Sequence, residues 1–411
     1  MRGYAVHLSS CAAAGRQRGA VPEKEAMKRV CLVVCNLYTA EVFLLDQIRA
    51  LTMEYDVTLA TNTENLGFLA ERGIHANLVQ IPIERKIHCR CDLRALYRLF
   101  RLFKEQGFVL VHSVDPKAGL LSMAAGMLAR VPIRIHTFTG QVWVTRKGTM
   151  RLLLKAVDRL IAQFATHILV DSSSQREFLL KHGIVAERNS FVLGHGSISG
   201  VDVCRFRPNP TTRQQIRTRY GVPADSLLFL YMSRLTRDKG ALVMAEAFAN
   251  FAAGDDRSHL FVVGPDEDGV LPAMNRLFRD CLPQVHFFGF TSVPEEFMAG
   301  ADVLCLPSFR EGFGTVLINA AAVGIPALAS HIYGSVDAVE DGRTGMLHEP
   351  GNVSEMVAHM IRLKNDPSLR KTLGDNGRSR VLRDFSEKLI TSAVLTFYGD
   401  ALAERVGVSN S

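Results

Sequence analysis

The sequence predicts an α/β protein built from two doubly wound parallel-sheet domains, and three observations support this fold class. Short apolar runs alternate with amphipathic helical patterns, as expected for parallel strands covered by helices on both faces. These runs fall into two separate series along the chain. Between the two series lies a polar stretch, residues 199–222, which we expect to be the hinge.

Each apolar run has the length and composition of a buried strand. The first series comprises Val30–Cys35, Val57–Thr61, Asn77–Ile81, Val109–His112, Ile133–Thr137, His167–Val170 and Phe191–Leu193. The second comprises Leu227–Met232, Leu260–Val263, Val285–Phe288, Val303–Leu306, Ala327–Ala329 and Gly345–Leu347. Two Rossmann-like domains facing each other form a cleft at the carboxyl ends of their strands, where ligands of such folds bind.

The chain divides into four expected segments. They are a disordered N-terminal extension (1–27), a first Rossmann-like domain (28–205), a second one (206–385) and a C-terminal helix crossing back toward the first domain (386–411). Translation could start at Met1 or at Met27, because the first strand pattern begins only at Arg29.

Composition excludes several classes of protein. Of 411 residues, 47% are hydrophobic and 22% charged, which is the balance of a globular protein and not of a disordered chain or a fibre. No apolar run reaches the roughly 18 residues of a membrane-spanning helix. Residues 1–200 carry 26 basic and 16 acidic side chains (+10), whereas residues 201–411 carry 22 and 25 (−3). This asymmetry suggests that the two halves have different partners or different functions.

The eight cysteines show neither a C-x-x-C pair nor zinc-finger spacing. We therefore expect free thiols and a cytoplasmic protein. The P-loop motif G-x-x-x-x-G-K-[ST] is absent, and no G-x-G-x-x-G turn follows the first strand. The acidic triplet Asp266–Asp268 resembles a metal site, but its place in a polar turn favours a solvated loop.

The second series carries charged residues at the carboxyl ends of two strands. Arg234 and Lys239 follow the run Leu227–Met232, just ahead of a helical pattern from Ala241 to Phe251. Two fixed cations beside the free amides of a helix start suit a diphosphate, although a solvated basic turn has the same pattern.

A glycine-rich segment follows the run Val303–Leu306. Here Glu311 precedes Gly312 and Gly314, and an apolar helical pattern runs on to Val323. The glycines let the backbone approach a ligand closely, and a carboxylate accepts hydrogen bonds from sugar hydroxyls. A diphosphate next to a sugar describes a nucleotide sugar. The alternative is an ordinary glycine-rich turn with a solvated glutamate.

Over residues 28 to about 400 the chain resembles the retaining GT-B glycosyltransferases of glycosyltransferase family 4. The most specific segments are Arg234-Leu235 with Lys239-Gly240, Pro307-Ser308 through Glu311-Gly312-Phe313-Gly314 to Gly324-Ile325-Pro326, and Asp341-Gly342 with Gly345. In the first half, His112–Gly119 and Arg134–Trp143 resemble the branch that builds bacterial capsule and O-antigen chains on a lipid carrier.

The resemblance implies a fold and a set of roles. The GT-B fold pairs an N-terminal acceptor domain (28–205) with a C-terminal donor domain (206–385). Arg234 and Lys239 would hold the donor diphosphate, and Glu311 would contact the donor sugar hydroxyls. The residues implied to cradle the sugar and phosphate are Gly312, Phe313, Gly314 and Thr315.

One position departs from the family pattern. The family has a second glutamate, bonding the ribose, eight positions after the first, and here Asn319 stands in its place. An amide bonds a ribose hydroxyl without charge, which weakens the contact by about 1 kcal/mol. His136 matches a histidine near the reacting sugar, and the acceptor-side candidates are His112, Lys117 and Gly140. Either histidine could instead be a polar residue at a strand end.

The activity implied is transfer of a hexose or N-acetylhexosamine from a UDP-sugar to a lipid-linked saccharide, with His136 and Glu311 as catalytic candidates. A retaining transfer can proceed on one face of the donor sugar, with the leaving phosphate accepting the acceptor's proton. Such a reaction needs no dedicated protein base. With two cations at the diphosphate no cofactor is required, and Mg²⁺ is compatible but not indicated.

Two basic amphipathic patterns occur in the first half. One spans residues 92–105 and the other residues 149–164. The first sets Arg94, Arg98, Arg101 and Lys104 against an apolar stripe of Leu93, Leu96, Phe100 and Phe103. The second repeats Arg151, Lys155 and Arg159. Such helices can lie on an anionic membrane, or they can be ordinary outer helices of the fold. Nucleic acid is not expected as a partner, because no recognition motif is present.

Two further functions stay open at this stage. Asn319 allows a catalytically weakened protein that binds nucleotide sugars without transferring them. A UDP-sugar 2-epimerase shares the two-domain layout and would convert the donor sugar without any acceptor. The pattern from Glu311 to Pro326 argues against the epimerase.

Overall fold

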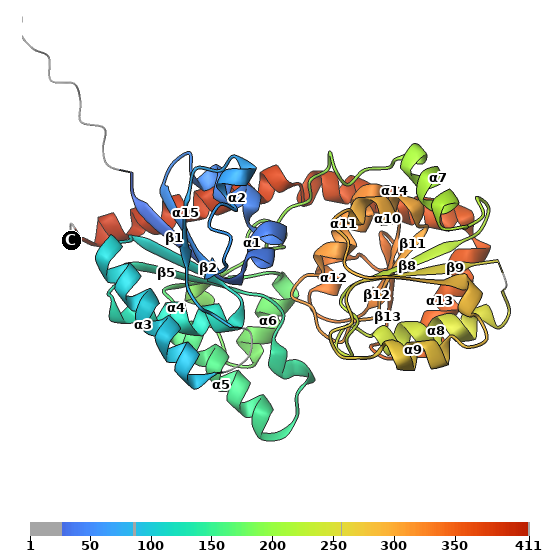
Figure 1. Cartoon of the computed structure of the whole chain (residues 1–411), viewed down its shortest axis with the longest axis horizontal. Helices are drawn as coiled ribbons and strands as arrows, with labels where there is room; N and C mark the ends of the chain where they lie inside the picture. Colours follow the sequence, from blue (N-terminus) through green and yellow to red (C-terminus); the bar gives the residue numbers. More distant parts are fainter. Residues whose placement is uncertain (1–26, 85–87, 256, 410–411) are drawn as a thin grey trace, which may run out of the picture.

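The computed structural model describes residues 27–84, 88–255 and 257–409, with side chains up to Glu404. The extension expected at the N-terminus falls almost entirely on residues 1–26, which lie outside this part of the chain. The described residues form two α/β domains side by side, each with a parallel sheet between layers of helices (Figure 1). The fold class predicted from the sequence is thus confirmed.

The N-terminal domain contains a seven-stranded sheet in the order β3-β2-β1-β4-β5-β6-β7, with every neighbouring pair parallel. Its strands are β1 (Arg29–Asn36), β2 (Asp56–Asn62), β3 (Asn77–Gln80), β4 (Leu110–Val114), β5 (Ile133–Phe138), β6 (His167–Val170) and β7 (Ser190–Phe191). The strand order reverses between β1 and β4, so the ligand-binding edge lies at their carboxyl ends.

The C-terminal domain contains a six-stranded parallel sheet in the order β10-β9-β8-β11-β12-β13. Its strands are β8 (Leu228–Met232), β9 (His259–Val263), β10 (Val285–Phe288), β11 (Val303–Leu306), β12 (Ala327–Ser330) and β13 (Gly345–His348). Here the order reverses between β8 and β11. Every apolar run predicted from the sequence overlaps one of these strands.

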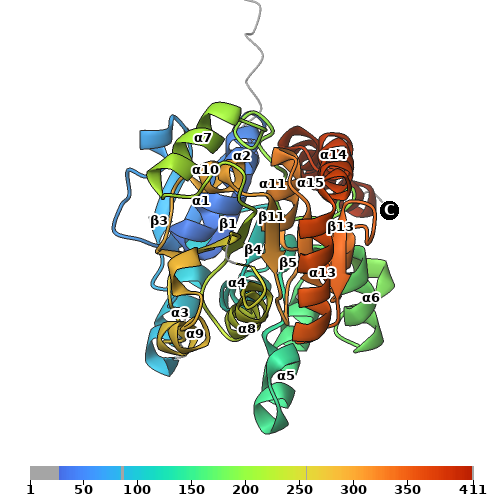
Figure 2. The same cartoon turned by 90° about the vertical axis from the view of Figure 1, so that its right-hand side faces the viewer.

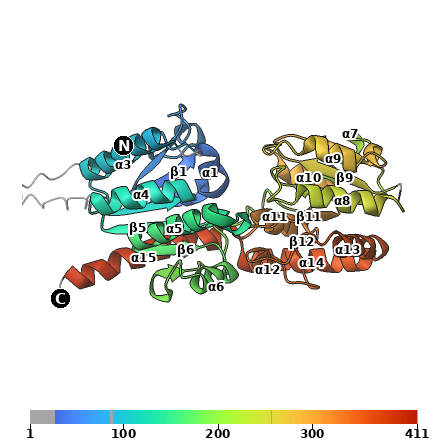
Figure 3. The ribbon, with the colours of Figure 1, turned by 90° about the horizontal axis from the view of Figure 1, so that it is seen from below.

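Helices cover both faces of each sheet (Figures 2 and 3). Those of the N-terminal domain are α1 (Leu37–Phe43), α2 (Leu45–Leu51), α3 (Cys89–Gln106), α4 (Pro116–Leu128), α5 (Gly148–Phe164) and α6 (Ser173–Lys181). Those that follow are α7 (Pro210–Arg219), α8 (Ala241–Ala252), α9 (Leu271–Leu277), α10 (Pro294–Gly300), α11 (Thr315–Val323), α12 (Ser335–Ala338), α13 (Val353–Asn365), α14 (Pro367–Asp384) and α15 (Glu387–Ser409).

The apolar residues of each strand are shared between two cores. In β1, Cys31 and Val33 pack against α3, α4 and α5, whereas Leu32 and Val34 pack against α2 and α15. All four side chains are at most 1% exposed. Burial on both faces explains why the strands read as continuous apolar runs and not as alternating ones.

The two domains are joined by two crossings of the chain that lie side by side. Val201 forms a parallel bridge with Ser386, with one bond from the Val201 N–H to the Phe385 carbonyl (2.8 Å) and another from the Glu387 N–H to the Val201 carbonyl (3.0 Å). After the second crossing, α15 runs back along the N-terminal domain (Figure 1). Its Tyr398 side chain is completely buried there.

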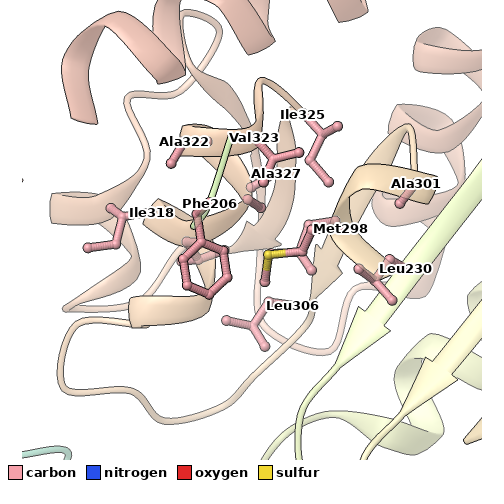
Figure 4. Packing of buried hydrophobic residues seen from close by; sticks show 14 of the residues in the cluster. Phe206, Leu230, Met298, Ala301, Leu306, Ile318, Ala322, Val323, Ile325 and Ala327 are labelled. Carbon is pink, nitrogen blue, oxygen red and sulfur yellow. The ribbon is translucent and has the colours of Figure 1, made fainter. Parts of the chain in front are cut away.

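The polar stretch 199–222, which we expected to be the hinge, is not a hinge over its whole length. Residues 210–219 form α7, which packs on α10 because the Arg217 side chain is buried and paired with Asp302 at 2.6 Å. Before this helix, Phe206 inserts among apolar side chains of the C-terminal core such as Met298 and Ile318 (Figure 4). Of the stretch 199–222, only the short crossing around Val201 lies between the two domains.

The apolar stripe expected on α3 is also shifted. Leu93 was assigned to the buried face but is 66% exposed, and the fully buried side chains are Ala95, Leu99 and Phe103. Leu96 and Phe100 are only partly buried against the core. The exposed face of α3 thus carries apolar side chains as well as arginines.

Candidate functional site

The charged residues predicted at two strand ends meet at the centre of the C-terminal sheet. Strand β8 is hydrogen-bonded to β11, with Phe229 opposite Val303. The loop after β8 holds Lys239, and the loop after β11 holds Glu311. Both loops leave the carboxyl edge of the sheet at the point where the strand order reverses, which is where ligands bind in such sheets.

Lys239 and Glu311 form a close ion pair at this point. The Lys239 Nζ lies 2.7 Å from both Glu311 carboxylate oxygens. The two side chains are only 17% and 9% exposed. Burial lowers the pKa of the Lys239 ammonium, and the carboxylate beside it acts in the opposite direction. The pair therefore holds a largely buried cation whose charge is balanced by the Glu311 carboxylate.

Two arginines, Arg234 and Arg310, lie close enough to this pair to influence the Lys239 ammonium electrostatically. The Arg234 Nη1 lies 2.7 Å from a carboxylate oxygen of Glu267, and this arginine is more than a third exposed. Arg310, immediately before Glu311, donates from Nη1 to the carbonyl of Gly140 at 2.9 Å. Each cation thus already has an acceptor in the protein, and the site is electrically balanced without a ligand.

The acidic triplet after β9 is tied to its own surroundings. The Asp266 carboxylate accepts hydrogen bonds from the backbone N–H groups of Val270 and Leu271 at the start of α9. Asp268 accepts one from the Arg237 N–H. Glu267 is left to face Arg234. Among the described residues, no cluster of three His, Cys, Asp or Glu side chains could hold a metal ion.

Helix α11 begins next to Glu311. Gly314 stands at its N-cap with a φ of +82°, in the left-handed region that favours glycine. Gly314 has no side chain to cap α11, and the Leu317 N–H donates to the Gly314 carbonyl at 2.8 Å, so the amides of Thr315 and Val316 are the ones that suit an anion. Thr315 opens the helix, and Asn319 lies one turn further and is partly buried. The Phe313 side chain, 2% exposed, points into the core beside Phe385, so only its backbone is free to face a ligand.

The N-terminal domain touches this loop directly. A Cβ added to Gly140 would lie 2.9 Å from the carbonyl carbon of Glu311, and one added to Gly312 would lie 2.5 Å from the Asp171 Oδ2. Such distances leave no room for a side chain at either glycine. The segment Thr139–Gly140 after β5 therefore forms the wall that faces Glu311. The structure brings the predicted residues Gly140, Lys239 and Glu311 together.

His136 does not reach this wall. Its side chain is 1% exposed, its Nδ1 is 2.9 Å from the Ser113 Oγ, and its ring packs on Gly119 and Phe138. Burial, helped by the nearby His112, lowers the pKa of His136 to about 3. The structure thus places the His136 side chain inside the N-terminal domain, and its place beside the reacting sugar stays a prediction.

The two other acceptor-side candidates, His112 and Lys117, have bonding partners within the N-terminal domain. His112 is buried, with its Nδ1 2.7 Å from the Tyr398 hydroxyl and its Nε2 2.7 Å from the Thr137 hydroxyl. Burial lowers its pKa to about 3, so the ring is neutral. Lys117 lies at the start of α4, where its Nζ is 2.6 Å from the Asp92 Oδ1. His112 therefore links β4 to α15, and its acceptor-side role stays a prediction.

Sequence inspection missed three residues at the wall. Arg310 directly precedes Glu311 and could have been found from that position alone. Asp171 and Gln175 belong to the polar turn after β6, which carries no glycine motif. The Gln175 side chain, which is buried, donates to the Thr139 carbonyl at 2.7 Å and to Gln141 at 3.0 Å. Only the sheet register brings this turn next to the loop after β5.

Comparison with known proteins identifies the family. Residues 212–380 match the sequence profile of glycosyl transferases group 1, and residues 39–193 match a glycosyl transferase 4-like domain. The capsular polysaccharide biosynthesis glycosyltransferase CapM of Staphylococcus aureus is 30% identical over 329 residues, covering 80% of this chain and 86% of CapM. The chain belongs to the group 1 glycosyltransferases.

Further similarities of this glycosyltransferase extend to one more relative and to a solved structure. An Escherichia coli UDP-Gal:α-D-GlcNAc-diphosphoundecaprenol α-1,3-galactosyltransferase is 25% identical, over 74% of this chain and 78% of that protein. The crystal structure of Anabaena HepE in complex with UDP and glucose superimposes with a TM-score of 0.77 at 18% identity, covering 91% of this chain and all of HepE. The glycosyltransferase thus has the GT-B fold.

Proposed function

We propose that the protein is a retaining glycosyltransferase that moves a hexose or N-acetylhexosamine from a UDP-sugar to a lipid-linked saccharide in cell-surface polysaccharide biosynthesis. The observation that carries the proposal is the buried pair of Lys239 and Glu311 beside the uncapped start of α11. A cation and free amides suit a diphosphate, and the adjacent carboxylate suits sugar hydroxyls. The UDP and glucose bound in HepE and the names of CapM and of the Escherichia coli relative support the same reaction.

In this reaction the donor changes the partners of the charged residues. The diphosphate takes Lys239 and Arg234 from their carboxylates, and the released Glu311 accepts hydrogen bonds from the donor sugar. The bond between the sugar C1 and the phosphate oxygen breaks, and the acceptor oxygen bonds to C1 from the same face. The acceptor's proton passes to the leaving phosphate oxygen. Lys239 and the α11 amides stabilise the charge that develops there.

The acceptor is proposed to arrive from an anionic membrane at the cytoplasmic face. On α5, Met150, Leu152 and Leu153 are 49%, 68% and 55% exposed, and Arg146, Lys147 and Arg151 beside them are exposed too. This end of α5 extends beyond the body of the molecule (Figure 2). Exposed apolar and basic side chains on one helix suit the interface of an anionic bilayer. None of the described helices is long and apolar enough to cross a membrane.

A panel of nucleotide sugars tests the donor. UDP-glucose, UDP-galactose, UDP-N-acetylglucosamine and UDP-N-acetylgalactosamine are added in a thermal-shift assay, with GDP-mannose as the control. The true donor at 100 times its Kd raises the free energy of unfolding by about 2.7 kcal/mol. The stabilising donor is then offered with a polyprenyl-diphosphate saccharide, and NMR gives the anomeric configuration of the product. A product of inverted configuration contradicts the retaining mechanism.

Asn319 supports a second candidate, a protein that binds the donor but transfers it poorly. Under that function, Asn319→Glu adds a charged partner for the ribose, strengthens UDP binding by about tenfold and turns transfer on. Under the leading function the wild-type protein already transfers sugar. A 2-epimerase would instead convert the UDP-sugar with no acceptor present, and the same assay without acceptor detects it.

A further inference from the structure

The two domains meet at the first turn of α6, residues 172–175, which is called the α6 turn below. It directly follows Asp171 at the carboxyl end of β6. Ser172 is the N-cap, and its hydroxyl accepts the Gln175 N–H. Figures 1 and 3 show α6 beside α12 of the C-terminal domain. The α6 turn is thus the part of the N-terminal sheet edge that faces the donor domain.

Two loops of the donor domain are bonded to this turn. The Ser172 hydroxyl donates to the Gly312 carbonyl at 3.1 Å. The Ser174 N–H donates to the Asp337 carboxylate at 3.3 Å, and the Ser174 hydroxyl donates to the same carboxylate. The Ser174 hydroxyl also accepts the Gly334 N–H at 2.9 Å. The loop after β11 and the loop after β12 are therefore held by one turn of one helix.

The same turn holds the wall opposite Glu311. The Gln175 Oε1 accepts the Asp171 N–H at 3.1 Å, while its Nε2 donates to the Thr139 carbonyl. Thr139 and Gly140 in turn pack on Glu311 and Gly312. Both sides of the contact around Glu311 are thus fixed from the α6 turn.

The packing leaves this contact little freedom. A Cβ on Gly334 would lie 2.4 Å from the Gly312 carbonyl oxygen. Nearby, the Phe178 ring of α6 stacks on Tyr333 at a centroid distance of 4.7 Å. The Gly312 peptide is enclosed by Ser172, Gly140 and Gly334. A shift of the α6 turn must therefore move the backbone next to Glu311.

We propose that Ser172 and Ser174 are positioning residues of the transfer reaction, which hold the Gly312 peptide and thereby orient the Glu311 carboxylate toward the donor sugar. The inference rests on the proposed function and adds the contact that keeps the two domains in their reactive arrangement. Donor contacts proposed above lie in the C-terminal domain alone. Loss of the α6 contact should therefore slow the chemical step more than it weakens UDP binding.

The test compares single substitutions in the turn. Ser174→Ala removes the hydroxyl that joins Asp337 and Gly334, and Ser173→Ala, an exposed neighbour in the same turn, is the matched control. We expect Ser174→Ala to lower kcat by about tenfold, the effect of one hydrogen bond to a charged group. The Kd for UDP, measured by calorimetry, should stay within about twofold, because UDP makes no contact with the turn.

Two further variants show whether the contact acts as proposed. Ser174→Thr keeps the hydroxyl and should recover most of the kcat. Asp337→Ala should lower kcat as Ser174→Ala does, and the double variant should lose little more, because both substitutions remove the same contact. An unchanged kcat in Ser174→Ala, or equal losses in kcat and UDP affinity, would overturn the positioning role.

Small-angle scattering separates this inference from the proposed function. Ser172→Ala combined with Ser174→Ala removes both hydroxyls of the α6 contact, so the domains should be held less closely and this double variant should have a larger radius of gyration than Ser173→Ala. An equal radius contradicts the inference whatever the protein catalyses. If the wild-type protein bound no UDP, the proposed function would fail, and the scattering comparison would still decide whether the turn holds the domains together.

Discussion

At the residue scale, the site is a set of charges that neutralise one another before any ligand arrives. Lys239 is paired with Glu311, and Arg234 with Glu267. A buried cation without a partner costs several kcal/mol, so the internal carboxylate stabilises the empty site. The same carboxylate competes with an incoming diphosphate for Lys239. Glu311 should therefore weaken the binding of a diphosphate to Lys239.

Glu311→Gln tests this competition. The amide removes the negative charge near Lys239 but keeps the shape, so UDP should bind as tightly as to the wild type or up to about tenfold more tightly. Transfer should fall by at least about 100-fold, because the donor sugar loses its charged hydrogen-bond acceptor. Calorimetry with UDP and the transfer assay measure the two effects. Weaker UDP binding in Glu311→Gln would contradict the competition.

Asp171 is a second buried acid in the same region. Burial raises its pKa from 3.8 to about 8, and its Oδ1 has no hydrogen-bond partner among the described residues. The folded protein thus holds a proton that the unfolded chain has released above pH 4. Stability from this group is complete below about pH 4 and is lost as the pH rises toward 8.

Asp171→Asn should remove that pH dependence. Relative to the wild type, the variant should gain free energy of unfolding as the pH rises from 5 to 8, by on the order of 2 kcal/mol. Urea denaturation at both pH values measures the difference. Glu177→Gln, an exposed acid on α6, is the control and should show no such gain. A constant difference between Asp171→Asn and the wild type would show that the acid is ionised when folded.

At the element scale, α5 combines a buried anchor with an exposed face. Trp143, just before the helix, donates from Nε1 to the Asp158 carboxylate at 2.8 Å and stacks on Phe178. These contacts fix the base of α5 to α6. The half that begins at Gly148 keeps its apolar side chains exposed. Exposed leucines on a well-anchored helix need a partner that covers them.

Replacing Met150, Leu152 and Leu153 by serine should weaken binding to vesicles. Each buried apolar side chain contributes about 1.5–3 kcal/mol, so vesicles with anionic lipid should lose at least about tenfold in affinity. Cosedimentation measures this, with Ile361→Ser on α13, another exposed apolar residue, as the control. If the triple serine variant and Ile361→Ser bound anionic vesicles with equal affinity, the exposed face of α5 would not be the membrane-binding surface.

At the scale of the whole molecule, α15 joins the two domains. It follows the second crossing and packs its Val394 and Tyr398 into the core of the N-terminal domain. The Tyr398 hydroxyl is bonded to the neutral ring of His112 on β4. The chain's last helix is thus part of the first domain's core, so the N-terminal domain is built from two separate segments of the sequence.

Tyr398→Phe should destabilise the N-terminal domain. The change leaves the buried His112 Nδ1 without a partner, which costs about 1–3 kcal/mol in the free energy of unfolding. Tyr97→Phe, at an exposed position on α3, is the control and should be neutral. Thermal unfolding followed by circular dichroism compares the two variants. Equal midpoints would mean that the hydrogen bond to His112 adds no stability.

Much of the fold was predictable because burial on both faces leaves a continuous apolar signal in each strand. Arg234, Lys239 and Glu311 were predictable for a related reason. They follow strands that the sequence already shows, and the carboxyl ends of neighbouring parallel strands meet at one edge. The surroundings of the two histidines were not predictable, because both faces of the sheet are covered and only the tertiary packing sets His112 against Tyr398 and His136 against Gly119.

The sequence by itself determined the two-domain α/β architecture and the charged residues that follow β8 and β11, since both depend on short segments whose chemistry is local. Only the tertiary structure decided which residues oppose them. The α6 turn, Asp171 and Gly140 meet Gly312 through contacts between parts of the chain that are up to 172 residues apart. Such contacts depend on how the two sheets face each other, and no local pattern of residue types records that geometry.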